Sequence, residues 1–214
     1  MSNGAATRTR RSREKIIAAA EEVFLHNGFL GANMDTVAEH AGVSKQTVYA
    51  HFHSKEALFI QVVEAMTGGA AREIREDEED VFGDRSVRDF LMQLALDQLT
   101  VVLTPRLMRL RRMVIGEVER FPELGRSLHD NGPGRSIRRM ERAFAHYTRI
   151  GQLATPDPRA AAVQFNWILM AAPTSAAMLL GDAGIPKPAE LRSHAAEAVR
   201  IFLCAFGPDA PRVE

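Results

Sequence analysis

The sequence predicts an all-α protein in which a small helix-turn-helix domain precedes a larger helical domain, with about nine helices in all. Three observations favour this fold class. Apolar residues recur at helical spacing along most of the chain, and alternating β-branched segments are few. The segment from Gly42 to Leu58 (GVSKQTVYAHFHSKEAL) divides into one apolar and one polar face. The length of 214 residues leaves room for a second domain of about 150 residues.

The first helix is expected from about Ser12 to His26, and Gly28 is a suitable residue to end it. Its apolar stripe consists of Ile16, Ala20, Val23 and Phe24. The second helix has its stripe at Met34, Val37, Ala38 and Ala41, with the spacing i, i+3, i+4, i+7. Asn33 is the preferred N-cap, because this stripe begins at the next residue. A capping box of Thr36 with Glu39 is the alternative.

A third, short helix is expected to begin after Ser44, whose hydroxyl can accept a hydrogen bond from a free N–H of the first turn. Gly42 suits the tight turn before it. Val48 and Phe52 lie four residues apart and form the buried side with Val43. The residues on the other side are Lys45, Gln46, Tyr49 and Ala50. Such side chains can meet base edges in a major groove, so this helix is a candidate DNA-reading element; a solvated polar face is the alternative.

Two neighbouring features favour DNA. Ser54 is placed to cap the next helix, and Lys55 in its first turn could anchor a phosphate together with free N–H groups. Basic residues also crowd the N-terminus, although the whole chain has 27 basic and 27 acidic residues. These residues are Arg8, Arg10, Arg11, Arg13 and Lys15, with Glu14 as the only acid among them. Such an arm can follow phosphates or enter a minor groove, and a solubilising disordered tail is the alternative.

Residues 10–66 resemble the N-terminal domain of the TetR (tetracycline repressor) family of bacterial transcription regulators. The resemblance rests on REKIIAAAEEVFLHNGF and on MDTVAEHAGVSKQTVYAHFHSKEALF. It implies an all-α homodimer whose first three helices bind operator DNA. It also implies a fourth helix that leads to a ligand-binding and dimerisation domain, with ligand binding releasing the DNA. The stretch from Glu117 to Met140 resembles the subgroup whose C-terminal domain is named after the AefR regulator.

The resemblance implies a set of DNA contacts in this chain. The residues placed toward bases are Lys45, Gln46, Thr47 and Tyr49, and those placed toward phosphates are Ser44, His51 and Lys55. Asn33 stands where the family often has Ser or Thr, and Thr36 and the arm residues Arg8, Arg10 and Arg11 complete the candidate set. The family often has a larger polar residue at Ala50 and an aromatic one at His51. These departures affect the expected base preference.

The expected domain organisation has four parts. Residues 1–9 form a disordered basic arm, and residues 10–56 form the helix-turn-helix domain. Residues 57–207 form the ligand-binding and dimerisation domain, and residues 208–214 form a tail. Two recognition helices of a dimer would lie about 34 Å apart, which predicts a palindromic or near-palindromic operator.

The larger domain is expected to begin with the acidic run REDEED (75–80) as a solvated linker. Helices are then expected over about Ser86–Leu103, from Pro105, from Pro122 with an interruption at 132–134, on to about Gly151, and over about Ala189–Phe206. The arginines interspersed in the helix after Pro105 are interpreted as half-exposed snorkelling side chains rather than as a second nucleic-acid surface.

The segment between Ala160 and Leu180 has no charged residue, so it could be a membrane span. Its polar residues and many alanines favour a buried helix instead. The two expected faces are Val163, Asn166, Trp167, Met170 and Thr174 on one side, and Phe165, Ile168, Leu169, Ala172 and Ala176 on the other. One face could line a pocket while the other meets the partner subunit.

A ligand pocket is suggested by adaptable methionines in this domain. The candidate pocket residues are Met92, Met108, Met113, Glu117, Asn166, Trp167 and Met170, with Glu117 and Asn166 as the polar groups that would orient a ligand. Methionine as core filler is the alternative. Few polar positions interrupt these helices, so the expected small-molecule effector is apolar or amphipathic.

The sequence disfavours an enzyme, since it has no recognisable catalytic or phosphate-binding motif, and no metal or cofactor is expected. Cys204 is the only cysteine, which excludes an internal disulfide and suits a cytoplasmic protein. No signal peptide is apparent. Together with the resemblance to the TetR family, these observations lead to the prediction of a ligand-released repressor. The alternatives are an activator or a partner-protein sensor of the same fold, and a helical binding protein or enzyme that does not use DNA.

Overall fold

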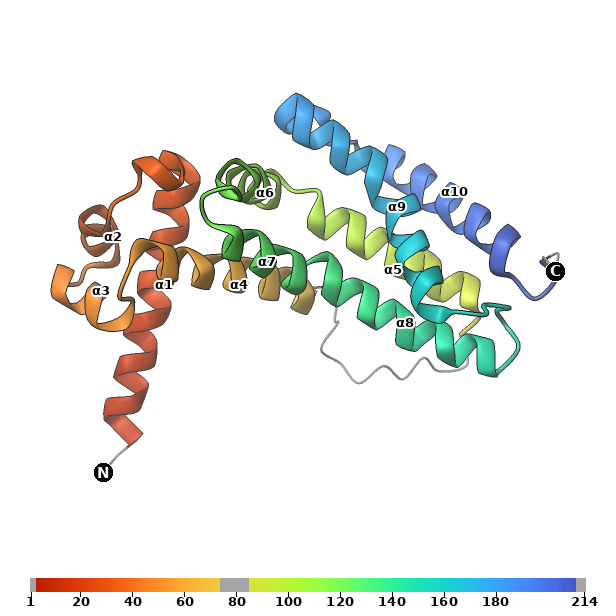
Figure 1. Cartoon of the computed structure of the whole chain (residues 1–214), viewed down its shortest axis with the longest axis horizontal. Helices are drawn as coiled ribbons and strands as arrows, with labels where there is room; N and C mark the ends of the chain where they lie inside the picture. Colours follow the sequence, from red (N-terminus) through yellow and green to blue (C-terminus); the bar gives the residue numbers. More distant parts are fainter. Residues whose placement is uncertain (1–2, 74–84, 211–214) are drawn as a thin grey trace. The chain divides into compact units, whose positions relative to one another are not determined.

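The computed structural model describes residues 3–73 and 85–210, with side chains over 6–68 and 85–210. Within these ranges the chain consists of helices and loops, without strands (Figure 1). The helices are α1 (Asn3–Gly31), α2 (Met34–Ala41), α3 (Lys45–His51), α4 (Lys55–Glu73), α5 (Val87–Val102), α6 (Pro105–Glu117), α7 (Pro122–Asn131), α8 (Pro133–Arg149), α9 (Pro158–Leu180), the 3₁₀ segment η1 (Gly181–Gly184) and α10 (Pro188–Phe206). The all-α prediction is confirmed. The linker predicted at 75–80 lies outside the described residues.

The described residues divide into two compact units, and the division differs from the predicted boundary after residue 56. The first unit combines the chain up to Gly68 with Arg109–His129, and the second contains the rest. The beginning of α4 belongs to the first unit because its apolar side is buried there. The residues concerned are Leu58, Phe59, Val62, Val63 and Met66. The ring of Phe121 packs edge-on against that of Phe29, with centroids 5.0 Å apart, so the later segment shares this core.

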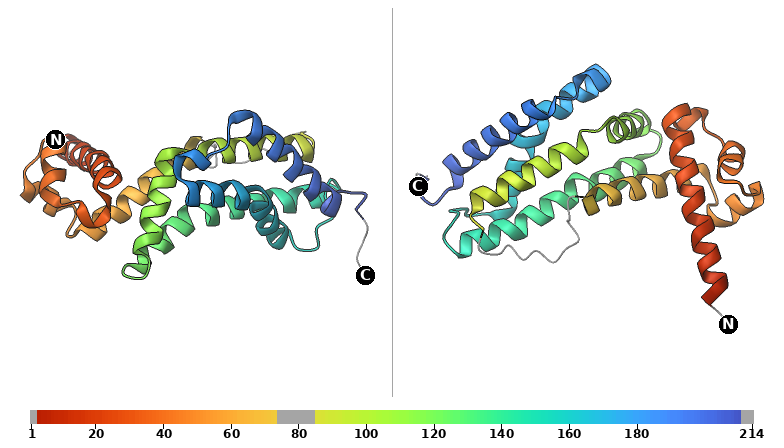
Figure 2. Two further views of the ribbon diagram at one scale, coloured as in Figure 1. Left: turned by 90° about the horizontal axis from the view of Figure 1, so that it is seen from above. Right: turned by 180° about the vertical axis from the view of Figure 1, so that it is seen from behind.

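Helix α1 begins at Asn3, so the expectation of a disordered arm over residues 1–9 is wrong for its described part. Alanines and arginines in this stretch favour a helix, and Arg10 pairs with Glu14 one turn later at 3.7 Å. The N-terminal half of α1 extends beyond α2 and α3 (Figure 2). Gly28 breaks the helix with φ 72°, as predicted, and a further turn continues to Gly31.

The second unit is built around α5, α8, α9 and α10, with contacts between α8 and α9, between α5 and α10, and between α9 and α10. Aromatic rings fill its centre. Phe202 of α10 lies between Phe144 of α8, at 4.9 Å, and Phe165 of α9, at 5.0 Å. Phe90 of α5 meets Tyr147 of α8 at 5.4 Å. These large rings are buried and hold the four helices together.

Helix α9 is a core helix, but its faces differ from the predicted division. The buried residues are Ala161, Ala162, Phe165, Asn166, Leu169, Met170, Pro173 and Ala177. Asn166 and Met170 thus share a face with Phe165 and Leu169, because positions i, i+3 and i+4 lie together on a helix. Trp167 is 62% exposed and points away from that face. The side chain of Gln98 donates to that of Asn166 at 3.0 Å, so the buried polar group is paired.

By length and composition, Pro158–Gly184 could span a membrane, with a mean hydropathy of 1.3 in its most apolar window. A core helix of a soluble domain passes the same test. The packing of α9 against α8 and α10, with a hydrogen-bonded asparagine in the contact face, fits a core helix.

Candidate nucleic-acid interface

The turn between α2 and α3 is closed by Gly42, which adopts the left-handed conformation at φ 65°. Its N–H donates to the carbonyls of Ala38 and Glu39, and the N–H of Val43 donates to Ala38 at 3.0 Å. These bonds satisfy the last carbonyls of α2. Val48 of α3 is fully buried beside the apolar side of α2. The polar side of α3 therefore faces outward, as predicted.

Both helices have the predicted side-chain caps. Asn33 accepts hydrogen bonds from the backbone N–H of Thr36 at 2.8 Å and from its hydroxyl at 3.1 Å. Ser44 accepts from the N–H of Thr47 at 3.1 Å, and the two hydroxyls lie 2.8 Å apart. Asn33 rather than a capping box thus begins α2. Four of the proposed DNA contacts have a local role in the free protein, which fixes where the two helices start.

The outer face of α3 carries Gln46, Tyr49 and Ala50, all exposed. Tyr49 is 42% exposed. Within the described part of the chain, neither Gln46 nor Tyr49 makes a polar contact. Their hydrogen-bonding groups are thus available to a partner outside the chain.

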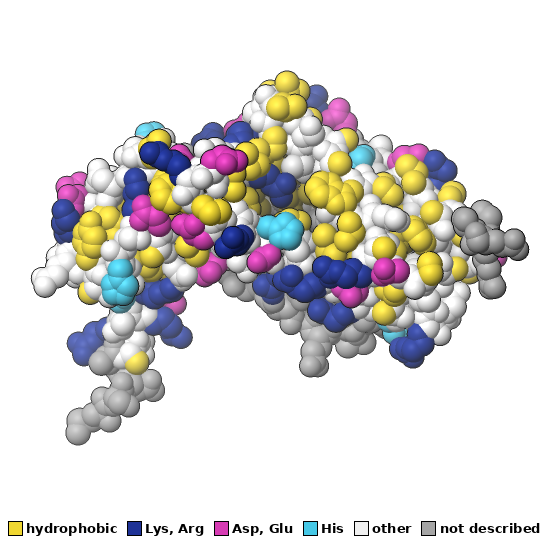
Figure 3. Space-filling model, viewed as in Figure 1, with side chains coloured by type: hydrophobic (Ala, Val, Ile, Leu, Met, Phe, Trp, Pro, Cys, Tyr) yellow, Lys and Arg dark blue, Asp and Glu magenta, His cyan; other side chains and the backbone are white. Residues whose placement is uncertain are grey.

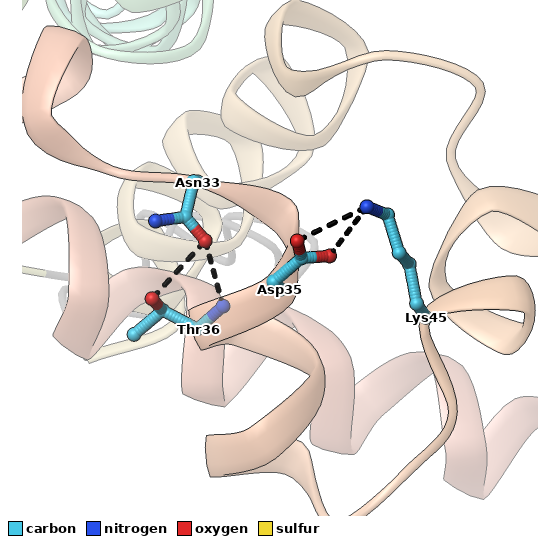
Figure 4. A network of polar contacts seen from close by, with 4 residues as sticks. All are labelled: Asn33, Asp35, Thr36 and Lys45. Atoms are coloured by element: carbon cyan, nitrogen blue, oxygen red, sulfur yellow. Dashed lines mark hydrogen bonds and ion pairs between the residues drawn. The ribbon is translucent and has the colours of Figure 1, made fainter.

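Lys45, the first residue of α3, is engaged by Asp35 of α2. Its Nζ lies 2.9 Å from Oδ1 and 3.0 Å from Oδ2 of the carboxylate (Figure 4). The hydrogen bond and the negative charge of Asp35 raise the pKa of Lys45 above its ordinary value, so the lysine is charged at neutral pH. Asp35 was missed by the sequence analysis. Its position in the first turn of α2 was apparent, but its closeness to Lys45 depends on the turn between the helices.

Lys55 has a structural role that the sequence did not indicate. Its Nζ donates to the carbonyls of Phe29 at 2.8 Å and Ala32 at 3.2 Å, and lies 4.6 Å from the centre of the Phe29 ring. The lysine thus caps the chain after α1, where carbonyls lack helical partners. Ser54 caps α4 as predicted, accepting from Ala57 N–H at 3.1 Å. A phosphate contact by Lys55 would compete with these bonds, and it stays a prediction.

The basic residues of α1 fall into two groups. Arg13 hydrogen-bonds Gln61 of α4, and its guanidinium lies 5.2 Å from the centre of the Phe52 ring, so it ties α1 to the core. Arg8, Arg10 and Arg11 are exposed on the extended part of α1. Basic side chains stand out on this part of the molecule in Figure 3. They are presented by a helix rather than by a loose arm.

Two histidines, His51 and His53, lie at the end of α3 and just after it. His51 is half-buried, with its ring 6.1 Å from that of Phe52, and His53 is exposed in the turn before α4. A phosphate contact by His51 stays a prediction.

The residues proposed for a ligand pocket are distributed over both units. Met108 and Met170 are buried in the core of the second unit, and Met92 packs against that core. Asn166 is buried there with Gln98, whereas Trp167 points outward. Met113 and Glu117 belong to the first unit. Trp167 is therefore a wrong choice for a pocket within the protomer, because the helical spacing was assigned to the wrong face.

Comparison with known protein families identifies the family to which this chain belongs. Residues 16–62 match the family described as bacterial regulatory proteins of the tetR family, and residues 89–208 match the AefR-like transcriptional repressor C-terminal domain. The chain belongs to the TetR family. The first match contains α2, the turn and α3, and the second covers more than half of the chain.

Solved TetR-family structures agree over almost the whole chain. A TetR-family transcriptional regulator from Mesorhizobium loti is 34% identical, with a TM-score of 0.84 over 94% of this chain and 98% of that one. The flavonoid-responsive regulator FrrA is 30% identical, with a TM-score of 0.77 over 94% of this chain and 99% of that one.

Curated relatives match over about a third of this chain. The transcriptional activator FasR of Mycolicibacterium smegmatis is 38% identical over 64 residues, which are 30% of this chain and 29% of FasR. The transcriptional regulator UidR of Escherichia coli is 35% identical over 75 residues, which are 35% of this chain and 38% of UidR. The chain thus spans well under half the length of these relatives.

Proposed function

We propose that this TetR-family protein is a sequence-specific, operator-binding transcription regulator, and that it acts as a repressor released by a small apolar or amphipathic ligand. The observation that carries the DNA-binding part of this proposal is the division of α3 into a buried and an exposed side. Val48 is fully buried on one side, while Gln46 and Tyr49 are exposed on the other with unused hydrogen-bonding groups. A helix so divided can dock on a protein core and read a major groove at once. We expect such a regulator to act in the cytoplasm, where its operator DNA lies.

A homodimer is the proposed binding form. Large apolar side chains on α9 and α10 are exposed in the protomer, namely Trp167, Leu179, Leu180 and Ile201. Exposed apolar surface on adjacent helices fits an interface between two copies of the chain. Two copies related by a two-fold axis would present two α3 helices to half-sites one helical turn apart, and the operator would then be palindromic or nearly so.

Footprinting on the DNA that adjoins the protein's own gene tests the proposal. Wild-type protein should protect a two-fold symmetric site, and Tyr49→Ala should weaken protection about tenfold or more, because a base or sugar contact would be lost. Tyr49→Phe is the matched variant and separates the hydroxyl from the ring. Tyr49 is exposed, so both variants should fold normally. A wild-type protein that protects no site at low salt would reject operator binding.

Release by a ligand needs its own measurement. FrrA is named as flavonoid-responsive, so flavonoids are the first compounds to test with this chain. A true effector should raise the melting temperature of the protein and weaken operator protection at the same concentration. If transcription from the operator rises when the protein binds, the protein acts as an activator, as FasR is named. An effector that strengthens protection would contradict release by the ligand. If a wide apolar panel gives no shift, a small-molecule effector of this kind is excluded.

A further inference from the structure

The carboxylate of Asp35 stands beside the first residue of the reading helix. It is held at 2.9 and 3.0 Å from the Nζ of Lys45, and both side chains are 59% exposed (Figure 4). The pair joins the first turn of α2 to the first turn of α3, ten residues apart. The seven residues of α3 include no acid, and the other acid at the outer side of α2, Glu39, is exposed. Asp35 thus forms an ion pair with the one lysine of α3.

Such a pair has different consequences for two kinds of DNA contact. Binding to arbitrary DNA depends on lysines and arginines that neutralise phosphates and release counterions. A lysine already neutralised by a carboxylate contributes less to that release. If it moves to a phosphate, it leaves an unpaired carboxylate beside the negatively charged backbone. A guanine edge differs, because its N7 and O6 can accept one N–H of the ammonium group within the groove while the carboxylate of Asp35 keeps another.

We propose that Asp35 is a specificity-determining residue of the DNA-binding face: it keeps Lys45 from binding phosphates at arbitrary sequences and holds it toward a base acceptor of the operator. The inference rests on the operator binding proposed above. Both side chains are exposed to solvent, and the ammonium group has three N–H donors, so a base acceptor at the right position can bind beside the carboxylate. Asn33 and Thr36 fix the start of α2, and they hold Asp35 in place beside Lys45.

The test compares Asp35→Asn with Glu39→Gln, which removes the same charge from the same helix without touching Lys45. Affinities are measured for the footprinted operator and for a random-sequence duplex of equal length, over a range of salt concentrations. Asp35→Asn should tighten binding to random DNA about three- to tenfold at 0.1 M salt and steepen its salt dependence by about one unit of slope. Operator affinity should change less than about twofold, so the ratio of specific to non-specific affinity falls.

A double substitution isolates the pair. In a Lys45→Gln background, Asp35→Asn should no longer change the specificity ratio, since no lysine is left for Asp35 to hold. The inference is overturned if Glu39→Gln lowers the ratio as much as Asp35→Asn, or if the effect persists without Lys45. It is also overturned if Asp35→Asn leaves the ratio unchanged while wild-type protein still binds its operator. Absence of any operator binding by the wild type would instead reject the proposed function, and this inference with it.

Discussion

Two different roles can be assigned to Lys55, which are capping the end of α1 and binding a DNA phosphate. Its ammonium group donates to the carbonyls of Phe29 and Leu30 in the last turn of α1 and of Ala32 just after it, and it lies over the Phe29 ring. The same group at the start of α4 is well placed, by sequence, to bind a phosphate. The structure favours the first role in the free protein, because the half-buried ammonium group already has three carbonyl acceptors.

Replacing Lys55 with methionine separates these roles. Met keeps the apolar stem and removes the charged hydrogen bonds, so we expect the free energy of unfolding to fall by about 1–2 kcal/mol in urea denaturation. Lys15→Met, at an exposed position of α1, is the control and should change it by less than about 0.5 kcal/mol. If Lys55→Met leaves stability unchanged but weakens operator binding, the phosphate role is the right one.

At the scale of elements, Pro173 in the middle of α9 is compensated by a residue of α10. A proline has no N–H, so the carbonyl four residues earlier, that of Leu169, loses its helical donor. His194 of α10 supplies a donor in its place, with its Nε2 2.7 Å from the Leu169 oxygen. Since a carbonyl only accepts, Nε2 must carry the proton. The carbonyl left without a helical donor thus takes part in a hydrogen bond that links α9 to α10.

A thermodynamic cycle tests this hydrogen bond. His194→Leu leaves the Leu169 carbonyl without a donor and should lower the free energy of unfolding by about 1–2 kcal/mol. Pro173→Ala restores an N–H at the position that normally bonds this carbonyl. In the Pro173→Ala background, His194→Leu should therefore cost clearly less than it does in the wild type, as measured by chemical denaturation. Strictly additive effects of the two substitutions would show that His194 acts elsewhere.

At the scale of the whole molecule, local signals explain what could be predicted. Asn33, Ser44 and Ser54 were recognised as caps because a cap acts within three residues, and most helix bounds followed from prolines and apolar spacing. Contacts between elements could not be predicted in this way. The bonds of Lys55 and the pairing of Asp35 with Lys45 depend on where helices meet. The face of α9 was misassigned because an almost uncharged helix gives a weak periodic signal.

Dimerisation gives the prediction that involves the whole protein. Trp167 is the only tryptophan, and it is 62% exposed on α9 of the protomer. If α9 and α10 meet a second copy, its fluorescence emission should lie toward the blue in concentrated solution and shift toward the red on dilution. Leu180→Glu, which introduces a charge at another exposed apolar position of α9, should give red-shifted emission at all concentrations, a monomer in sedimentation equilibrium and greatly weakened operator binding.

Ile150→Glu is the matched control, because Ile150 is also an exposed apolar residue of the second unit but follows α8 rather than lying on α9 or α10. This variant should remain dimeric with unchanged emission. Blue emission that does not respond to Leu180→Glu would place Trp167 against something other than the partner's α9 and α10. Emission typical of a solvated tryptophan at every concentration, in a wild-type protein that sediments as a dimer, would move the interface off this face. In that case the spacing of the two α3 helices, and with it the expected symmetry of the operator, would have to be derived from another surface.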